Sequence, residues 1–363
     1  MTAGSPAPAT LAPSAEELVR ALAVADEALA EAGRSCGEAR HRLEVSGESI
    51  DLVFAGERLA EGVVPSFAHK ERSSNGGAPA LTIQLCDAAT SGRAIPLPPC
   101  LEEASLRRAE FPTYRSRRIE ALYDWDRRVL HMLDRELRRA IYWTEDAAAV
   151  PLWEHAGSLR QILVWWLRDG PLQLLHAGAV GREDGGVLLV GRSGSGKSTS
   201  TAACVASGLR IVGDDTVLAR ADPFPVAESL YGSVKLTPDG LERFPALGAR
   251  AANEGRDADE KAIVYLSEAL PGKLVEALPL RALLIPKIVA RAEARLLPAR
   301  PAQGLLALAP STLFQANGAH RGAFRVLAQI VEKLPAYVLE VGTDATQIPR
   351  VIEALLDGEV PRG

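Results

Sequence analysis

The sequence predicts an α/β domain in the second part of the chain and an α+β region before it. Three observations support this fold class. After Pro171, short apolar strands alternate with a turn, a glycine-rich loop and a helix, an order typical of α/β folds. Near Pro151, short strand-like segments give way to a helical stripe of apolar residues. The 363 residues also exceed the ~100–200 residues usual for one domain, so we expect more than one compact part.

The composition is that of a globular protein with no overall affinity for polyanions. Hydrophobic residues make up 47% of the chain and charged residues 24%, close to the average for folded domains. The formal net charge of -5 gives the chain no general electrostatic reason to bind nucleic acid or an anionic membrane. We therefore expect neither nucleic acid nor membrane among its partners.

Cysteine usage and hydropathy indicate a cytoplasmic protein. The four cysteines, Cys36, Cys86, Cys100 and Cys204, are scattered without a CxxC pair, which argues against a zinc ribbon and a disulfide framework. A window of about 18 apolar residues is absent. Residues 1–13 lack the basic start and apolar run of a secretory signal, so we expect a disordered leader there and reduced thiols elsewhere.

The α+β region is expected over residues 14–150. A helical stripe of apolar residues over Ala15–Ala32 opens it. Ser49–Ala55 and Leu81–Cys86 are short runs of β-forming residues. Arg127–Asp146 alternates well enough to predict a hairpin, and its content of Leu, Arg and Glu leaves a helix as the alternative.

The α/β domain is expected over residues 151–363. Its first helix covers Leu159–Leu167 and stops at Asp169-Gly170-Pro171. The elements expected after it are strands at Leu172–Val180, Val187–Val190, Leu209–Gly213 and Tyr337–Val341, an apolar run at Leu280–Val289, and helices at Ser198–Ser207, Ser311–Leu334 and Thr346–Leu356. Ser311–Thr312 is expected to be the N-cap of its helix.

One motif in this domain has the pattern of a phosphate-binding loop, the Walker A motif. The segment Gly191–Thr199 matches GxxxxGK(S/T) at every fixed position, after an apolar strand and before a helix. Its glycines let N–H groups turn inward, and the helix adds its positive end, so phosphate oxygens are expected there. Lys197 is expected to reach the β- and γ-phosphates, and the Ser198 hydroxyl to join a bridging magnesium ion. The predicted nucleotide-binding residues are Gly191, Ser193, Gly194, Ser195, Gly196, Lys197, Ser198 and Thr199.

Two adjacent aspartates follow the next strand. Asp214 comes seventeen residues after Lys197, and Asp215 follows it. Only one helix separates the loop from this strand, so we expect the carboxylates on a neighbouring strand, at the edge that faces the ligand crevice. Side chains alternate along a strand, so the two are expected to differ in role. We favour Asp214 as base and Asp215 as magnesium ligand; the reverse stays open, and a turn cap is the structural alternative.

His176 precedes the loop by fifteen residues, on the expected strand Leu174–Val180. It is a candidate to bond a γ-phosphate oxygen or one of the aspartates. A structural role is the alternative, because a lone histidine on a strand is more often structural.

The order of these residues resembles that of the HPr kinase/phosphorylase family, whose catalytic domain shares a core with ATP-dependent phosphoenolpyruvate carboxykinase. The resemblance covers about Leu172–Leu218 and is carried by Leu175-His176-Ala177-Gly178, the phosphate loop and Gly213-Asp214-Asp215. It implies a P-loop kinase domain that uses ATP and Mg²⁺ to phosphorylate a serine. It further implies that His176, Lys197, Ser198, Asp214 and Asp215 carry the reaction.

The chain departs from that family in two places. Thr199 follows the loop serine where the family kinases carry an acidic residue. The later glycine-rich signature that engages HPr is missing, and Leu280–Pro286 is only a faint echo of it. The chain looks more like the HPr-kinase-like proteins found with peptide-modifying gene sets, including lasso-peptide kinases. That resemblance implies a small protein or peptide with an acceptor serine as the partner.

Three functions remain as expectations. The leading one is an ATP-dependent serine kinase; the others are a nucleotide-dependent switch with slow ATP hydrolysis and a small-molecule kinase or carboxykinase relative. Lys235, Lys261 and Arg281 are candidates to close over the triphosphate, or else ordinary surface cations. The oligomeric state stays open, a homo-oligomer included.

Overall fold

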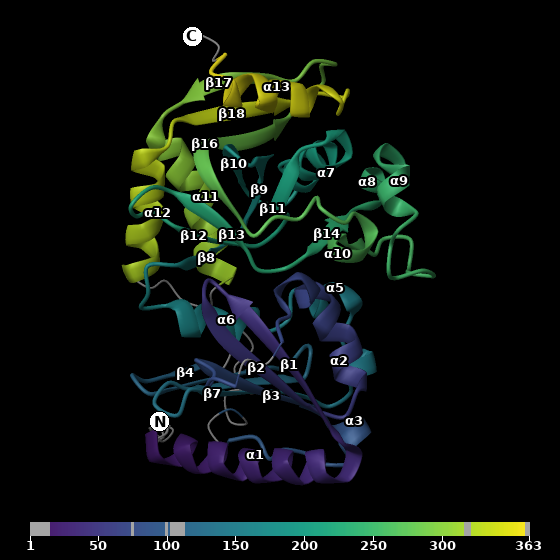
Figure 1. Ribbon diagram of the computed structural model, residues 1–363, viewed down its shortest axis with the longest axis vertical. Helices are drawn as coiled ribbons and strands as arrows, with labels where there is room; N and C mark the ends of the chain where they lie inside the picture. The colour runs from purple at the N-terminus through teal and green to yellow at the C-terminus, as the bar shows by residue number, and fades with distance from the viewer. Residues whose placement is uncertain (1–14, 74–75, 99–100, 102–112, 316–320, 360–363) are drawn as a thin grey trace, which may run out of the picture. The chain divides into compact units, whose positions relative to one another are not determined.

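The computed structural model describes residues 15–73, 76–98, 101, 113–315 and 321–359 (Figure 1). The expected leader at residues 1–13 and Cys100 lie outside the described residues. The chain divides into two compact units. The first comprises Met1–Arg40, Leu52–Leu59 and Ala80–Ala149, and the second comprises His41–Asp51, Ala60–Pro79 and Val150–Gly363. The boundary expected near residue 150 would place His41–Asp51 and Ala60–Pro79 in the first part. The structure groups these two segments with the second unit.

The chain has a mixed α/β fold with two large mixed sheets. The elements up to residue 149 are α1 (Ala15–Cys36), β1 (Glu38–Val45), β2 (Glu48–Ala55), α2 (Arg58–Val63), η1 (Val64–Lys70), β3 (Leu81–Asp87), α3 (Ala88–Ser91), β4 (Thr113–Arg115), β5 (Ile119–Asp124), β6 (Val129–Asp134), β7 (Arg139–Thr144) and η3 (Ala147–Ala149).

The elements from residue 150 onward also combine strands and helices. They are α5 (Leu152–His155), α6 (Arg160–Leu167), β8 (Gln173–Leu175), β9 (Ala177–Arg182), β10 (Gly185–Val190), α7 (Lys197–Ser207), β11 (Arg210–Gly213), β12 (Val217–Arg220), β13 (Val226–Ser229), β14 (Ser233–Leu236), α8 (Pro238–Arg243), α9 (Pro245–Gly248), β15 (Ala262–Tyr265), α10 (Leu266–Ala269), β16 (Ala277–Ile288), β17 (Arg295–Ala299), α11 (Pro301–Gln315), α12 (Arg321–Lys333), β18 (Ala336–Val341) and α13 (Gln347–Leu356).

The first sheet has seven strands in the order β1-β2-β3-β7-β6-β5-β4. β3 pairs with β7 in parallel, and the strands from β7 to β4 pair antiparallel. β6 and β7 form the hairpin expected within Arg127–Asp146, so the helix alternative is wrong. Asp134 fixes the turn, because its Oδ1 accepts the N–H groups of Glu136 and Leu137.

Helix α1 contributes one apolar stripe to the core of the first unit. Leu18, Leu22, Ala25 and Leu29 are buried in a cluster with side chains of β5, β6 and β7. Their spacing of three and four residues places them on one helix face, as the sequence pattern predicts.

The second sheet has nine strands, and the long strand β16 joins its two branches. One branch runs β11-β9-β10-β16-β18-β17, and the other runs from β16 through β13 and β12 to β8. β10, β16 and β18 are parallel, and the other pairs are antiparallel.

Strand β10 is buried on both faces. Val187 and Leu189 belong to the core cluster shared with α7 and α13, and Leu188 and Val190 belong to the cluster shared with α11 and α12 (Figure 1). A strand covered on both sides is expected to be continuously apolar, as this one is.

Two expected elements of the second unit are divided in the structure. The expected strand Leu172–Val180 breaks at His176, because β8 pairs with β12 whereas β9 pairs with β10 and β11. The expected helix Ser311–Leu334 is two helices, and α11 begins already at Pro301, where proline suits the first helical turn. Ser311–Thr312 therefore lies inside α11 and is not an N-cap.

Among the described residues, no helix has both the length and the apolar character needed to cross a bilayer. Cys36, Cys86 and Cys204 are free thiols. Burial raises the pKa of Cys86 to about 11, so this thiol stays protonated and unreactive near neutral pH.

Polar contacts bind the segment Ala60–Pro79 to the rest of the second unit. The Lys70 side chain is 3% exposed and is paired with the Glu276 carboxylate. Arg72 Nη2 lies 3.2 Å from the same carboxylate. A lysine buried to this degree needs an anion, because an unpaired buried charge is costly.

We predict that Glu276→Gln lowers the free energy of unfolding by about 1–2 kcal/mol, because it leaves the buried Lys70 ammonium without an anion. The expected loss is modest because the Glu276 side chain is 56% exposed and water screens the pair. Urea unfolding of the full chain measures it. Glu268→Gln alters an exposed glutamate of α10 and is the control. Equal unfolding midpoints for the two variants would contradict the role given to Lys70.

Candidate active site

The predicted site residues meet at one edge of the second sheet (Figure 1). β10 ends at Val190, directly before the phosphate loop, and β11 ends at Gly213, directly before Asp214. β9 is antiparallel to both, so its start, next to His176, lies at the same edge. β16 and β18 run parallel to β10 and end there too. The strand directions thus gather these residues at the carboxyl ends of parallel strands, where α/β folds bind ligands.

The order along this edge differs from the expectation in one respect. The aspartate strand β11 is not next to β10, because β9 lies between them. β9 and β10 form a hairpin, with Arg182 opposite Gly185, and a hairpin strand takes the neighbouring position. The order is therefore Asp214–Asp215, His176, the phosphate loop, the end of β16 and the end of β18.

The phosphate loop has the conformation that its glycines permit. Gly191, Gly194 and Gly196 have φ values of 149°, 76° and 107°, which residues with side chains rarely adopt. A Cβ at Gly191 would also lie 2.8 Å from Ser195 Oγ, so a side chain there would require the serine hydroxyl to move. α7 begins at Lys197, and the first N–H groups of a helix have no intrahelical partner and suit an anion.

The Lys197 side chain folds back over this loop. Its Nζ donates to the carbonyl oxygens of Gly191 at 2.7 Å and Arg192 at 3.2 Å, and the residue is buried. Burial lowers the pKa of the ammonium, although Asp215 and Asp214 favour its charged form. The cation thus lies beside the loop and within electrostatic range of both carboxylates.

Asp214 is the buried member of the aspartate pair. It is 1% exposed, and its Oδ2 accepts the backbone N–H of Lys235 at 3.2 Å. Its Oδ1 has no hydrogen-bond partner in the described part of the chain. Burial and then the charge of Asp215 raise the pKa of Asp214 to about 6, whereas the Lys235 N–H and the hydroxyls of Thr201 and Ser198 lower it. A buried carboxylate beside a serine hydroxyl is a donor set that fits a cation.

Asp215 faces the cavity. Its Oδ1 lies 3.3 Å from His176 Nδ1, and its Oδ2 lies 3.9 Å from Lys235 Nζ. Burial on its own would raise the pKa of Asp215, but the neighbouring His176 and Lys235 lower it overall. Asp215 is therefore ionised near neutral pH and held between two partners.

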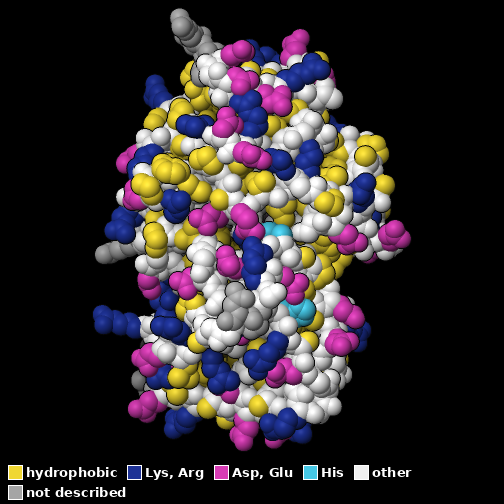
Figure 2. All heavy atoms as spheres, in the orientation of Figure 1, with side chains coloured by type: hydrophobic (Ala, Val, Ile, Leu, Met, Phe, Trp, Pro, Cys, Tyr) yellow, Lys and Arg dark blue, Asp and Glu magenta, His cyan; other side chains and the backbone are white. Residues whose placement is uncertain are grey.

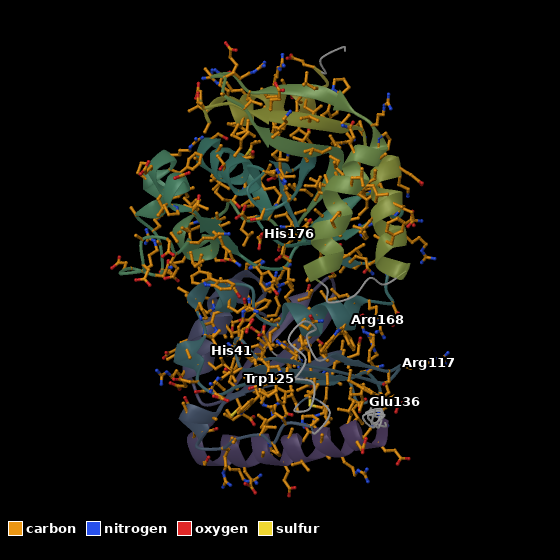
Figure 3. All side chains as sticks on the ribbon, turned by 180° about the vertical axis from the view of Figure 1, so that it is seen from behind. His41, Arg117, Trp125, Glu136, Arg168 and His176 are labelled. Carbon is orange, nitrogen blue, oxygen red and sulfur yellow. The ribbon has the colours of Figure 1, made fainter. Side chains whose placement is uncertain are left out.

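His176 lies at the bend between β8 and β9 (Figure 3). Burial lowers the pKa of its imidazole, so the ring is neutral near pH 7. Its backbone N–H donates to Thr312 Oγ1 of α11 at 3.1 Å. No local sequence pattern marks this contact, because 136 positions separate the two residues.

A cavity of about 410 Å³ opens over these residues, a size typical of small-molecule sites. His176, Asp215 and six of the eight predicted loop residues line it; Gly191 and Ser195 do not. Asp214 is not part of its lining either.

One part of the cavity wall was not predicted from the sequence. It consists of Leu236–Gly240 and Arg243, from the end of β14 and from α8. The local signal there is a helix start, and Thr237 Oγ1 indeed caps α8 by accepting the Gly240 N–H at 3.3 Å. A cap predicts a helix boundary and not a ligand contact.

The three residues that were candidates to close over the triphosphate lie in different parts of the second unit. Lys261 lines the cavity. Lys235 contacts both aspartates, through its backbone N–H and its ammonium. Arg281 Nη2 donates to the Asp184 carbonyl oxygen at 3.0 Å and does not line the cavity.

The described residues contain no group of three or more His, Cys, Asp or Glu side chains that could hold a metal ion. Mg²⁺ does not require one, because it is usually bound by one or two carboxylates together with waters and substrate phosphates. Ser198 and Asp214 fit such a site, since Asp214 Oδ1 is buried without a partner.

No family model matches the chain, and no curated protein matches it. Among solved structures, the HPr(Ser) kinase/phosphatase from Coxiella burnetii is similar at 14% sequence identity, over 52% of this chain and 95% of that chain. The TM-score is 0.28, and a likeness this low carries no argument about fold or function. The interpretation of the site therefore rests on its own geometry.

We predict that Thr312→Val makes amide hydrogen exchange at His176 faster and lowers the free energy of unfolding by about 1–2 kcal/mol. Valine keeps the shape of threonine but leaves the buried N–H without an acceptor. Ser311→Ala is the control, because the Ser311 hydroxyl makes only a 3.4 Å contact with the Leu308 carbonyl oxygen. Unchanged exchange at His176 in Thr312→Val would show that the hydrogen bond contributes nothing.

Proposed function

We propose that this protein is an ATP-dependent phosphotransferase that moves the γ-phosphoryl group of ATP, with Mg²⁺, to a serine hydroxyl of a small protein or peptide. The observation that carries the proposal is the pair of adjacent carboxylates beside the phosphate loop. One is buried with an unpartnered oxygen, and the other faces the cavity. Phosphoryl transfer needs bound phosphates, neutralised charge and a positioned acceptor, and the site offers a group for each.

The phosphate loop would bind the polyphosphate through its inward N–H groups and the start of α7. Lys197 would exchange its contacts with the carbonyl oxygens of Gly191 and Arg192 for phosphate oxygens. Because burial disfavours the charge of this lysine, an anion at the loop stabilises it more than the neutral carbonyls do.

Ser198 and Asp214 would hold Mg²⁺, which when bound neutralises charge on the β- and γ-phosphates. The Lys235 N–H occupies Asp214 Oδ2 and leaves Oδ1 for the ion. Burial raises the pKa of Asp214, and a cation beside it would lower that pKa again and so favour the charged form.

Asp215 would orient the acceptor hydroxyl and take its proton late in the reaction. The sequence alone favours the opposite assignment, with Asp214 as base and Asp215 on the metal. Two observations support the reversal. Asp215 lines the cavity whereas Asp214 does not, and both oxygens of Asp215 already lie near His176 and Lys235.

His176 and Lys235 would position this base. A neutral imidazole can donate its Nδ1–H to Asp215 Oδ1, and the Lys235 ammonium faces the other oxygen. An imidazole near one oxygen and an ammonium near the other favour one orientation of the carboxylate before the substrate binds.

The choice of acceptor rests on the motif order in the sequence, because an aspartate beside a γ-phosphate serves any hydroxyl acceptor. Incubation with γ-labelled ATP and a peptide pool tests it, and labelled phosphoserine supports the proposal. Release of ADP without transfer would instead indicate a nucleotide-dependent switch. A labelled metabolite would indicate a small-molecule kinase, and either result would refute a serine kinase.

We predict that Lys197→Ala weakens Mg-ATP binding about 10–100-fold and abolishes transfer, since a charge-assisted contact to phosphate is lost. Calorimetric titration measures the affinity. Lys333→Ala is the control, because this lysine is paired with Asp222 away from the cavity. Equal affinities for the two variants would refute the phosphate-binding role of Lys197.

We predict that Asp215→Asn lowers turnover about 10²–10⁴-fold and leaves Mg-ATP affinity within about threefold. The substitution removes the general base but none of the groups that would bind the phosphates. Asp214→Asn should instead raise the Mg²⁺ concentration needed for half-maximal turnover. Both are measured as ADP release during magnesium titrations. If Asp215→Asn raises the magnesium requirement and Asp214→Asn does not, the assignment derived from the sequence is the correct one.

A further inference from the structure

The cavity has an apolar end that the proposed transfer chemistry does not use. Ile288, the last residue of β16, lines the cavity and is 61% exposed. Val341, the last residue of β18, is its partner in the sheet register and lines the cavity too. Ile288 Cγ1 and Val341 Cγ2 each lie 3.4 Å from the position that a Cβ would take at Gly196. Val341 is buried, so it supports Ile288 from below, and the exposed Ile288 side chain forms an apolar ledge against the phosphate loop.

Single exposed aliphatic side chains are common on protein surfaces, so the exposure of Ile288 is not unusual by itself. Its position in the cavity is unusual. Leu306 on α11 is 73% exposed but is not part of the cavity lining, whereas Ile288 faces the cavity beside the loop that would hold phosphates. An apolar surface next to an anion-binding loop suits a ligand with a charged end and an apolar end.

The ledge and the aspartates lie on opposite sides of the loop. The loop follows β10, and in the strand order β9 and β11 come on one side of β10 whereas β16 and β18 come on the other. His176 and Asp214–Asp215 belong to the first side, and the ledge to the second. Transfer requires the terminal phosphoryl group to lie toward the aspartates, so the remainder of a bound nucleotide extends toward β16 and β18.

We propose that the ledge formed by Ile288, with Val341 beneath it, is the binding site for the nucleobase of the bound nucleotide. This inference rests on the proposed function, from which it takes the orientation of the triphosphate. The flat apolar face of a base would cover the exposed Ile288 side chain and remove apolar surface from water. Pro238 of α8 is exposed, lines the same cavity and supplies an apolar contact from a second element.

An apolar side chain of the acceptor is the competing occupant. The acceptor hydroxyl has to reach Asp215, however, and the ledge lies beyond the phosphate loop from that residue. A nucleoside triphosphate has its phosphates and its base at opposite ends of one molecule. It therefore occupies the loop and the ledge together, which favours the nucleobase.

Calorimetric titration of the full chain with Mg-ATP and with Mg-tripolyphosphate distinguishes the contribution of the nucleoside to binding from that of the phosphates. We expect Ile288→Ser to weaken Mg-ATP binding about five- to twentyfold and to change Mg-tripolyphosphate binding less than about twofold. Ile288→Leu keeps the apolar surface and should keep the affinity for Mg-ATP. Leu306→Ser is the matched control, because Leu306 is exposed on α11 and does not line the cavity, and it should leave both ligands unaffected. Figure 2 shows hydrophobic side chains on the surface over α12, so exposed apolar surface is not confined to the cavity.

Three results would overturn the inference. Equal weakening of both ligands by Ile288→Ser would mean that the ledge only supports the loop. Unchanged Mg-ATP affinity in that variant would mean that the nucleobase binds elsewhere. The same conclusion would follow if the unaltered protein bound Mg-ATP no more tightly than Mg-tripolyphosphate. If the unaltered protein binds neither ligand, the phosphotransferase proposal itself fails, which distinguishes the two failures.

Discussion

The site depends on a close approach that only a residue without a side chain permits. A Cβ at Gly178 in β9 would lie 2.9 Å from the Asp214 carbonyl oxygen and 2.9 Å from Thr201 Oγ1 of α7. Real Cβ atoms essentially never show such contacts, so any side chain here would push β11 or α7 away. The phosphate loop at the start of α7 and the aspartates after β11 are therefore brought together over the strand between them, because that strand leaves room for both.

Within this arrangement two neighbouring carboxylates acquire different properties. Both residues lie in the bend that follows β11, where Asp214 is buried and Asp215 lines the cavity. Burial and then the charge of Asp215 raise the pKa of Asp214 to about 6, whereas His176 and Lys235 lower the pKa of Asp215 against the effect of burial. Lys235 contributes to both environments, through a backbone N–H on one carboxylate and an ammonium near the other. Titratable neighbours whose pKa values are pushed apart are typical of sites with divided roles.

The parts of this site that sequence reasoning reached are those encoded locally. The glycine spacing of the phosphate loop, the strand before it and the helix after it all lie within a few turns of chain, so the pattern specifies its own structure. The strand order is not encoded locally. β9 lies between β10 and β11 because β9 and β10 form a hairpin, and the apolar sequence of a strand does not show which strand pairs with it. Likewise, Thr312 reaches His176 from a helix 136 positions away, and Lys235 reaches the aspartates from β14. Contacts of this kind follow from tertiary packing and not from a motif.

The same strand order assigns the two ends of the cavity to different parts of the chain. The aspartates and His176 come from β11 and the start of β9, whereas Ile288 and Val341 come from β16 and β18. Strand β14 lies beside the aspartates, because Lys235 contacts both of them, whereas the next residue, Leu236, is buried in the core beside the cavity. Consecutive side chains of one strand leave in opposite directions, so a shift of β14 that moves one of these residues moves the other as well.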